Sequence, residues 1–310
     1  MKAAVLHSLG GIPRYEDFPD PVPTGEEVLV DVKAVAVENV DRAIAAGTHY
    51  TAGAPEFPSI PCFDGIGALP DGTVVGFGNL RAPYGALAER AAVSAYGPIP
   101  EGVDPAVAAV MSSAITGMSM RMAAALKPGE TVLVQGATGV AGRLAMQVAR
   151  LLGAGRVVAV GRDSNRLREL GADAVITTAV DDTALRTAYA ENGPYDVVVD
   201  FLWGRPTEIL LSTLIPTSFA FAKPTRLIQV GESAGAELTI QASSLRTSGV
   251  EIYGAAKGLT AETMAEAYGQ VVEWTREGAL TYDIERVSLS DIESAWQRTD
   301  LQGRRLVVVF

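Results

Sequence analysis

The chain has 310 residues, of which 48% are hydrophobic and 20% charged, and its formal net charge is −11. This length exceeds the usual size of one hydrophobic core and predicts two domains. The composition excludes a disordered chain, and the acidic balance argues against nucleic acid as a partner. Cys62 is the only cysteine and there are two histidines, which excludes an internal disulfide and disfavours a four-ligand structural zinc site.

The N-terminus lacks an apolar segment followed by a cleavage site, so we expect no signal peptide. The longest weakly charged run, 105–120, is too short for a membrane span and is predicted to be a buried helix. We therefore expect a cytoplasmic protein that does not contact a membrane.

Residues 1–100 are predicted to be β-rich, because β-branched residues and alternation are frequent there. The expected strands are 2–6, 27–37, 72–79 and 85–93. A proline-punctuated loop occupies 19–27, and helices are expected at 39–46 and 105–125.

Beyond residue 127 strands and helices alternate. TVLVQ (131–135) is a nearly continuous apolar run, typical of a strand buried on both faces. A helix is predicted over 139–152, because Val140, Leu144, Val148 and Leu151 share one face. The further predicted elements are strands at 156–160, 173–177, 195–202, 226–231 and 250–256, and a helix at 164–170. This alternation predicts an α/β fold with a doubly wound parallel sheet.

The C-terminal part is predicted to contain a helix at 261–277 and a strand at 285–289. SDIE (290–293) has the spacing of a capping box that opens a last short helix, and 304–310 reads as a final strand. Because other material flanks the parallel sheet on both sides, we expect a discontinuous second domain. Its limits are placed at 1–112 and 256–310, with the parallel sheet in 113–255.

VQGATGVAG (134–142) follows a predicted strand and opens a predicted helix, which is the context of a dinucleotide-binding turn. Gly139 lets the backbone approach a pyrophosphate, and Gly142 lets the helix pack close to the sheet. Backbone N–H groups at the helix N-terminus face the anion. Ala137 stands at the first glycine of G-x-G-x-x-G and adds only a methyl group. These features favour a nucleotide site over a turn that merely contains three glycines.

The end of the second strand of this unit indicates which nucleotide is bound. NAD sites place an Asp or Glu there to accept a hydrogen bond from the ribose 2′-OH. Here Gly161 leaves space and Arg162 offers a guanidinium, which pairs with a 2′-phosphate. Arg166 has the spacing to face the same way, whereas Asp163 would serve as the acid one position late. The pattern favours NADPH over NADH. The missing acid also argues against an S-adenosylmethionine methyltransferase, which places an acid on the ribose hydroxyls.

Several segments together resemble the medium-chain dehydrogenase/reductase superfamily, specifically its zinc-independent quinone oxidoreductase branch. They include MKAAVL (1–6), the run from Leu126 to Ile176, IQVGESAG (228–235) and GRRLVVV (303–309), so the resemblance spans the chain. It implies a Rossmann domain inserted into a discontinuous, β-rich GroES-like domain. It also implies NADPH-dependent hydride transfer to a quinone, enone or related electrophilic carbonyl acceptor, and a homodimer.

The resemblance also assigns roles to individual residues. Asn39 and Asp41 would lie in the loop that approaches the nicotinamide and the substrate, and Tyr50 would end that segment at the cleft. The implied cofactor contacts are Ser119 near the nicotinamide, Ala137, Thr138, Gly139, Val140, Ala141 and Gly142 at the pyrophosphate, Gly161 and Arg162 at the adenosine ribose, and Leu202, Trp203 and Gly231 along the nicotinamide ribose.

The chain departs from the alcohol dehydrogenase branch. ENVD (38–41) and CFDG (62–65) replace its catalytic Cys and its Gly-His-Glu, so no metal is expected. Cys62 stands where a glycine is usual and is not expected to be a nucleophile. Without zinc, charge that develops on the substrate oxygen needs hydrogen-bond donors. Tyr50, Asn39 and Ser119 are the candidates, and no proton donor is assigned.

Two alternatives stay open. The glycine turn also resembles atypical short-chain dehydrogenases, and Tyr253 and Lys257 have the Y-x-x-x-K spacing of that family. The strand pattern around Tyr253 argues against the helix that would bring the two side chains together. The second alternative is an NADPH-binding sensor or structural protein without turnover.

Overall fold

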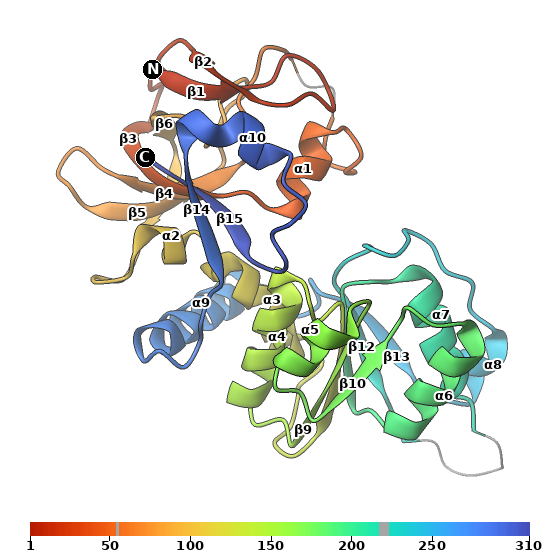
Figure 1. Ribbon diagram of the computed structural model, residues 1–310. Helices are drawn as coiled ribbons and strands as arrows, with labels where there is room; N and C mark the ends of the chain where they lie inside the picture. Colours follow the sequence, from red (N-terminus) through yellow and green to blue (C-terminus); the bar gives the residue numbers. More distant parts are fainter. Residues whose placement is uncertain (54–55, 217–222) are drawn as a thin grey trace. The chain divides into compact units, whose positions relative to one another are not determined.

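The computed structural model describes residues 1–53, 56–216 and 223–310 (Figure 1). The chain divides into two compact units. The split unit comprises Met1–Met111 and Tyr282–Phe310, and the inserted unit comprises Ser112–Thr281. In the part of the chain that is described, no helix has both the length and the apolar character needed to cross a membrane.

The inserted unit contains, among its described residues, a six-stranded parallel sheet in the order β10-β9-β8-β11-β12-β13. Its strands are β8 (Thr131–Gln135), β9 (Arg156–Gly161), β10 (Ala174–Thr177), β11 (Val197–Asp200), β12 (Arg226–Gln229) and β13 (Glu251–Gly254). The order reverses at β8, which is the doubly wound Rossmann arrangement. Gln135 of β8 lies beside Asp200 of β11 at this reversal, where such sheets bind their ligands.

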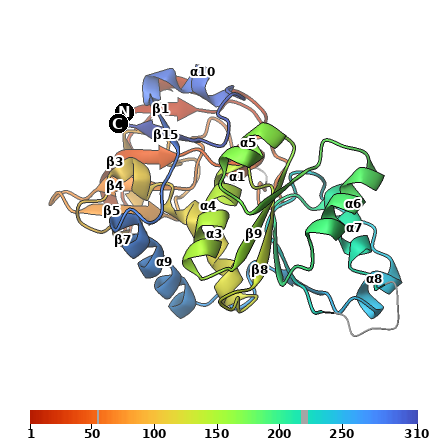
Figure 2. The same cartoon turned by 60° about the horizontal axis from the view of Figure 1, so that its bottom comes forward.

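Helices cover both faces of this sheet. The helices described for the inserted unit are α3 (Met111–Met122), α4 (Val140–Leu151), α5 (Ser164–Glu169), α6 (Asp182–Asn192), α7 (Gly204–Thr213), α8 (Ala242–Arg246) and α9 (Ala261–Arg276). Figures 1 and 2 show α3 and α4 on one face and α6, α7 and α8 on the other. The strands are therefore buried on both sides, which explains their nearly continuous apolar sequences.

The split unit is built on a mainly antiparallel sheet whose described strands follow the order β14-β15-β3-β4-β5-β7, with β6 also paired to β3. The bounds are β3 (Val28–Ala36), β4 (Asp64–Ala68), β5 (Val74–Gly78), β6 (Arg90–Val93), β7 (Ala95–Pro98), β14 (Ile284–Ser288) and β15 (Arg305–Val309), beside a hairpin of β1 (Lys2–Val5) and β2 (Arg14–Asp17). Its helices are α1 (Asn39–Ala45), α2 (Pro105–Ala108), the 3-10 helix η1 (Leu289–Asp291) and α10 (Ile292–Trp296). Because β15 lies between β14 and β3, the two ends of the chain share one sheet.

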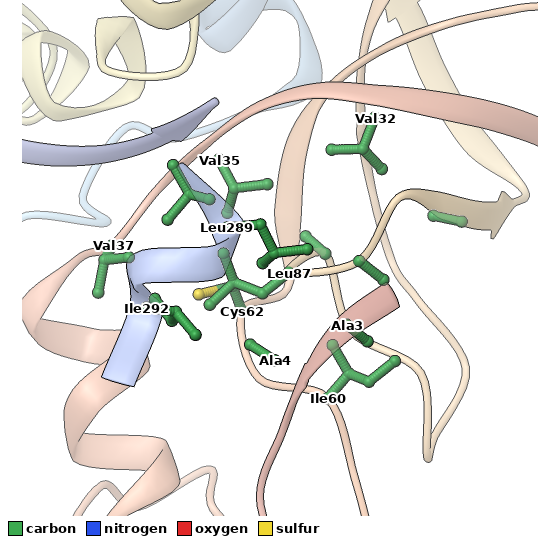
Figure 3. Close-up of a cluster of buried hydrophobic side chains, with 14 of the residues drawn as sticks. Ala3, Ala4, Val32, Val35, Val37, Ile60, Cys62, Leu87, Leu289 and Ile292 are labelled. Carbon is green, nitrogen blue, oxygen red and sulfur yellow. The ribbon is translucent and has the colours of Figure 1, made fainter. Parts of the chain in front are cut away.

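The core of the split unit also joins the two ends of the chain. Figure 3 shows Cys62 among apolar side chains that include Val37 and Ile292. Leu289 of η1 and Leu87 belong to the same buried cluster. The segment 282–310 is thus part of this hydrophobic core, which confirms that this unit is discontinuous.

Three details differ from the sequence-based expectations. The expected helix 105–125 is two helices, α2 and α3, interrupted near Ala109 without a glycine or proline there. The capping box expected at 290–293 is absent from the described hydrogen bonds, because Ser290 lies in the 3-10 turn and its hydroxyl donates to Ser288 Oγ at 3.0 Å. Strands β2, β4 and β7 were not anticipated from the sequence.

The second limit between the units also differs from the expected one, since the inserted unit continues to Thr281 and not to residue 255. The Gln147 side chain of α4 accepts from Thr281 N at 2.9 Å and donates to Thr281 O at 3.1 Å. Gly258 lies so close to α3 that a Cβ there would be 2.7 Å from Met122 O. These contacts hold α9 and its flanking segments on the inserted unit.

Candidate functional site

The glycine turn follows β8 at the point where the strand order reverses. Gly136 has a φ of +84°, a left-handed conformation that favours glycine. Gly136 N and Ala137 N both donate to Val160 O at 2.9 Å, which fixes the turn to β9. Gly136, one position earlier than the fingerprint predicts, therefore makes the tight turn, and the buried Ala137 is accommodated. The G-x-x-G-x-x-G spacing of 136–142 was the sequence signal for this glycine.

The other two glycines shape the N-terminus of α4. A Cβ on Gly142 would be 2.2 Å from Gly136 O, so only glycine permits this helix to approach the turn. Gly139 is the exposed N-cap residue, and no side chain caps the helix there among the described residues. The N–H groups of the first turn lack partners within the helix and carry its positive end. This bare helix N-terminus fits a pyrophosphate.

The end of β9 lies next to this turn. A Cβ on Gly161 would be 3.2 Å from Thr138 Cγ2, so Thr138 lies directly against Gly161. Arg162 is exposed, and its backbone oxygen accepts from Thr177 Oγ1 at 3.0 Å. In the described part of the chain, no ion pair involves the Arg162 side chain.

Asp163 has a local function that the sequence left open. Its carboxylate caps α5, where it accepts from the N–H groups of Asn165 at 3.0 Å and Arg166 at 3.2 Å. Arg166 Nε also lies 3.3 Å from Asp163 Oδ2. Asp163 is therefore occupied as a helix cap, and Arg162 is the more available of the two arginines.

The loops after β11 and β12 are bound to each other at the same edge of the sheet. Gly231 N donates to Asp200 O at 3.1 Å, and Ala234 N donates to Leu202 O at 2.8 Å. Trp203 has a φ of +56°, and its side chain packs against the hydrophobic core of the inserted unit. The backbone of Leu202 and of Gly231 thus takes part in the hydrogen bonds that join these two loops.

Ser119 is placed differently from these residues. Its side chain is fully buried in α3, and its hydroxyl donates to Thr116 O at 2.6 Å. The hydroxyl therefore already has a partner in its own helix.

The split unit carries the remaining candidates, on α1 and the segment after it. Asn39 is exposed at the start of α1, and Tyr50 is 93% exposed with its ring 4.2 Å from the His49 ring. Asp41 is only 2% exposed. It accepts from Glu38 N at 2.7 Å as part of a capping box. Asp41 therefore stabilises the start of α1 from the interior, whereas Asn39 and Tyr50 are accessible.

Several ionisable side chains face Asp41 in this interior. Burial raises the pKa of Asp41 to about 7, and the neighbouring Asp64 and Glu38 add to the rise. Burial likewise raises the pKa of Asp64 to about 7. Arg305 donates to Val37 O at 3.1 Å and opposes both shifts. Asp41 Oδ1 has no hydrogen-bond partner among the described residues, so the protonated carboxyl is favoured.

We expect Asp41→Asn to flatten the pH dependence of unfolding. The folded-state pKa of Asp41 lies above its ordinary value of 3.8, so folding takes up a proton in the interval between them. The resulting stabilisation is complete below about pH 4 and is lost as the pH rises through about 7. The wild type should lose roughly 2 kcal/mol more than the variant between about pH 5 and pH 8.

Urea unfolding at the two pH values measures this difference. Asp71→Asn is the control, because a hydrogen bond from Thr73 N lowers the pKa of that exposed carboxyl. If Asp41→Asn kept the wild-type slope, Asp41 would not be the group that retains the proton.

Cys62 has the geometry of the glycine that it replaces. Its φ is +68°, and it is 8% exposed. Burial raises the pKa of its thiol, and the neighbouring Asp41 and Asp64 act in the same direction. A thiol that stays protonated is a poor nucleophile, in agreement with the expectation. Among the described residues, no group of three or more His, Cys, Asp or Glu side chains could hold a metal ion.

The Y-x-x-x-K pair lies on a strand and the turn after it. Tyr253 belongs to β13, and Lys257 Nζ lies 3.1 Å from the centre of its ring. The two side chains therefore form a cation–π contact. They do not have the helical arrangement of a short-chain dehydrogenase, so the strand interpretation is confirmed.

A doubly wound sheet with a glycine turn at its switch point is the arrangement of the Rossmann-type dinucleotide-binding fold, and here it is inserted into a discontinuous β-rich unit. No family model matches the chain. It is 26% identical over 347 aligned residues to a probable NADPH-dependent quinone reductase from Emericella nidulans, over 96% of both chains. It is also 26% identical to a chloroplastic quinone oxidoreductase from Triphysaria versicolor, over 92% of this chain and 90% of that one.

Among solved structures, the quinone oxidoreductase from Thermus thermophilus, also determined with NADPH, matches 100% of both chains. The identity is 28% and the TM-score is 0.81. These comparisons confirm the resemblance to medium-chain reductases of the quinone oxidoreductase type. They also confirm the expected fold, a Rossmann domain inserted into a GroES-like domain.

Proposed function

We propose that this protein is an NADPH-dependent oxidoreductase that reduces a quinone, enone or related electron-poor carbonyl compound. The observation that carries the proposal is the bare N-terminus of α4, held against β8 and β9 by Gly136 and Gly142. The full-length similarity to quinone reductases supports the same activity. When bound, NADPH supplies the hydride that reduces the acceptor.

The inserted unit binds and orients the cofactor. The segment 137–142 binds the pyrophosphate with backbone N–H groups. Gly161 leaves room for the adenosine ribose, and the Arg162 guanidinium pairs with its 2′-phosphate. Arg166 adds positive charge nearby, although Asp163 shares it. The backbone at Leu202, Trp203 and Gly231 borders the nicotinamide ribose. Ser119, within α3, lies near the nicotinamide.

The split unit, Met1–Met111 with Tyr282–Phe310, provides the substrate side. Asn39 and Tyr50 are accessible donors for the acceptor oxygen, where negative charge develops during reduction. A phenol hydroxyl and a side-chain amide NH₂ both donate hydrogen bonds. Asp41 acts indirectly, because its capping box fixes the start of α1.

Further assignments complete the proposal. The reaction proceeds without zinc, which agrees with the two histidines and single cysteine. The protein is cytoplasmic and its partner is a small electrophilic acceptor, with neither nucleic acid nor a membrane. Two copies form a homodimer, for which the outer edge of β13, at the end of the described sheet, is available.

The function is tested by steady-state oxidation of NADPH against a panel of quinones and enones. We expect at least one acceptor to give a kcat/KM above about 10⁴ M⁻¹s⁻¹, with NADPH preferred over NADH and no effect of a chelator. Tight NADPH binding without turnover of any acceptor would instead support a nucleotide-binding protein. Failure to bind NADPH would exclude both functions.

A further inference from the structure

A chain of buried polar side chains lies beneath the two loops that border the nucleotide site. Asp200, at the end of β11, is fully buried. Its Oδ1 accepts from Leu202 N at 2.9 Å and Trp203 N at 3.0 Å. Its Oδ2 accepts from Thr207 Oγ1 of α7 at 2.6 Å. The carboxylate thus fixes two consecutive N–H groups, just where Trp203 takes its left-handed conformation.

The series of hydrogen-bonded side chains continues from Asp200 to the residue before the glycine turn. Thr207 Oγ1 accepts from Gln135 Nε2 at 2.9 Å, and Gln135 Oε1 accepts from the Tyr189 hydroxyl of α6 at 2.5 Å. Gln135 is the last residue of β8 and directly precedes Gly136. The same four side chains therefore connect the residue before the glycine turn with the residue before the Phe201–Gly204 loop.

Each hydrogen bond in this chain runs in one direction. Burial, with the nearby Asp200, raises the pKa of Tyr189 well above its usual range, so the phenol stays protonated and donates to Gln135. The Gln135 amide must then turn its NH₂ group toward Thr207, whose hydroxyl proton is left for Asp200. Burial raises the pKa of Asp200, whereas the hydrogen bonds from Thr207, Trp203 and Leu202 lower it. The described partners of the carboxylate all donate to it, and such bonds favour its ionised form. Buried networks of this kind have a single arrangement when every member is satisfied.

We propose that Asp200 is a positioning residue that, through Thr207, Gln135 and Tyr189, holds the glycine turn and the Phe201–Gly204 loop in the arrangement that binds NADPH. This inference rests on the proposed function, because it concerns the geometry of the same cofactor site. None of the three outer side chains needs to contact the cofactor. Their effect is transmitted through the backbone at Gly136 and at Leu202 and Trp203.

The first test uses the protein without nucleotide. Thr207→Val removes the central hydroxyl, and Tyr189→Phe removes the outermost donor. Both should raise amide hydrogen exchange at Leu202 and Trp203 about fivefold or more, because each leaves a buried polar group unsatisfied. Tyr195→Phe is the matched control. The buried Tyr195 hydroxyl donates to the backbone oxygen of Tyr189 at 2.7 Å and does not belong to the series of hydrogen-bonded side chains. Thr207→Ser keeps the hydroxyl and should restore wild-type exchange.

The second test measures NADPH affinity in the same proteins. Thr207→Val and Tyr189→Phe should raise the Kd about five- to twentyfold, with Thr207→Ser and Tyr195→Phe near the wild type. The inference would be overturned if all four variants bound NADPH with the wild-type Kd, or if all four showed the same amide hydrogen exchange at Leu202 and Trp203. The proposed function would still stand in either case. If the wild type bound no NADPH, the proposed function would fail, and the role of Asp200 in cofactor binding with it.

Discussion

Gly142→Ala is expected to destabilise the protein by roughly 3 kcal/mol and to abolish measurable NADPH binding. The added Cβ would lie 2.2 Å from Gly136 O and 2.8 Å from Ala137 Cα. Both contacts are with backbone, so no side chain is able to rotate away. The helix must move off the turn, and the N–H groups at its start move with it. Thermal unfolding and NADPH titration measure the two effects.

Two other glycines serve as controls for this substitution. A Cβ on Gly269, within α9, meets no atom within 4 Å, so Gly269→Ala should stabilise the protein by up to about 1 kcal/mol. A Cβ on Gly139 would be 3.4 Å from Gly136 O, an ordinary contact. Gly139→Ala should therefore fold normally but bind NADPH less tightly, because its methyl group occupies the exposed anion surface. Wild-type stability and affinity in Gly142→Ala would refute the close approach of α4.

Arg162→Ala is expected to weaken NADPH binding roughly tenfold to a hundredfold and NADH binding less than about twofold. A guanidinium paired with a 2′-phosphate is a charge-assisted contact that NADH does not make. The backbone at Arg162 is fixed by the Thr177 hydroxyl, so the substitution should leave the end of β9 in place. Titration with each nucleotide measures the two dissociation constants.

Arg168→Ala is the matched control for the loss of charge. Arg168 is an exposed arginine of the adjoining helix α5, and its guanidinium donates to Asn165 Oδ1 at 3.0 Å. Arg168→Ala removes one positive charge, as Arg162→Ala does, and should change the binding of NADPH and of NADH little. Equal losses for NADPH and NADH in Arg162→Ala would refute a 2′-phosphate contact at this residue.

The strands of the inserted unit were predictable because each is buried on both faces. Such strands are short apolar runs bounded by turn residues, as at 131–135, and their alternation with helices determines the fold class. The glycine turn was predictable for a similar reason, since its chemistry lies within nine consecutive residues. Local patterns thus indicated the architecture and the glycine turn at the switch point of the sheet.

Long-range contacts set the features that were not predicted. Asp200 reads as the polar end of a strand, and only the folded chain brings Thr207 and Gln135 to it. Asp41 reads as a loop residue near the substrate, yet tertiary packing buries it beside Asp64. The fingerprint predicts the tight turn at position 137, whereas Gly136 makes it. Which of the two residues makes the turn depends on the backbone φ angle, which composition does not specify.

The position of β15 has a consequence for synthesis on the ribosome. This strand lies inside the sheet of the split unit, between β14 and β3, yet it is translated after the whole of the inserted unit. When the first 111 residues emerge, the edge of β3 that later pairs with β15 is therefore still unpaired. The inserted unit has all six described strands of its sheet before translation ends. In this chain, vectorial folding completes the middle of the sequence before its beginning.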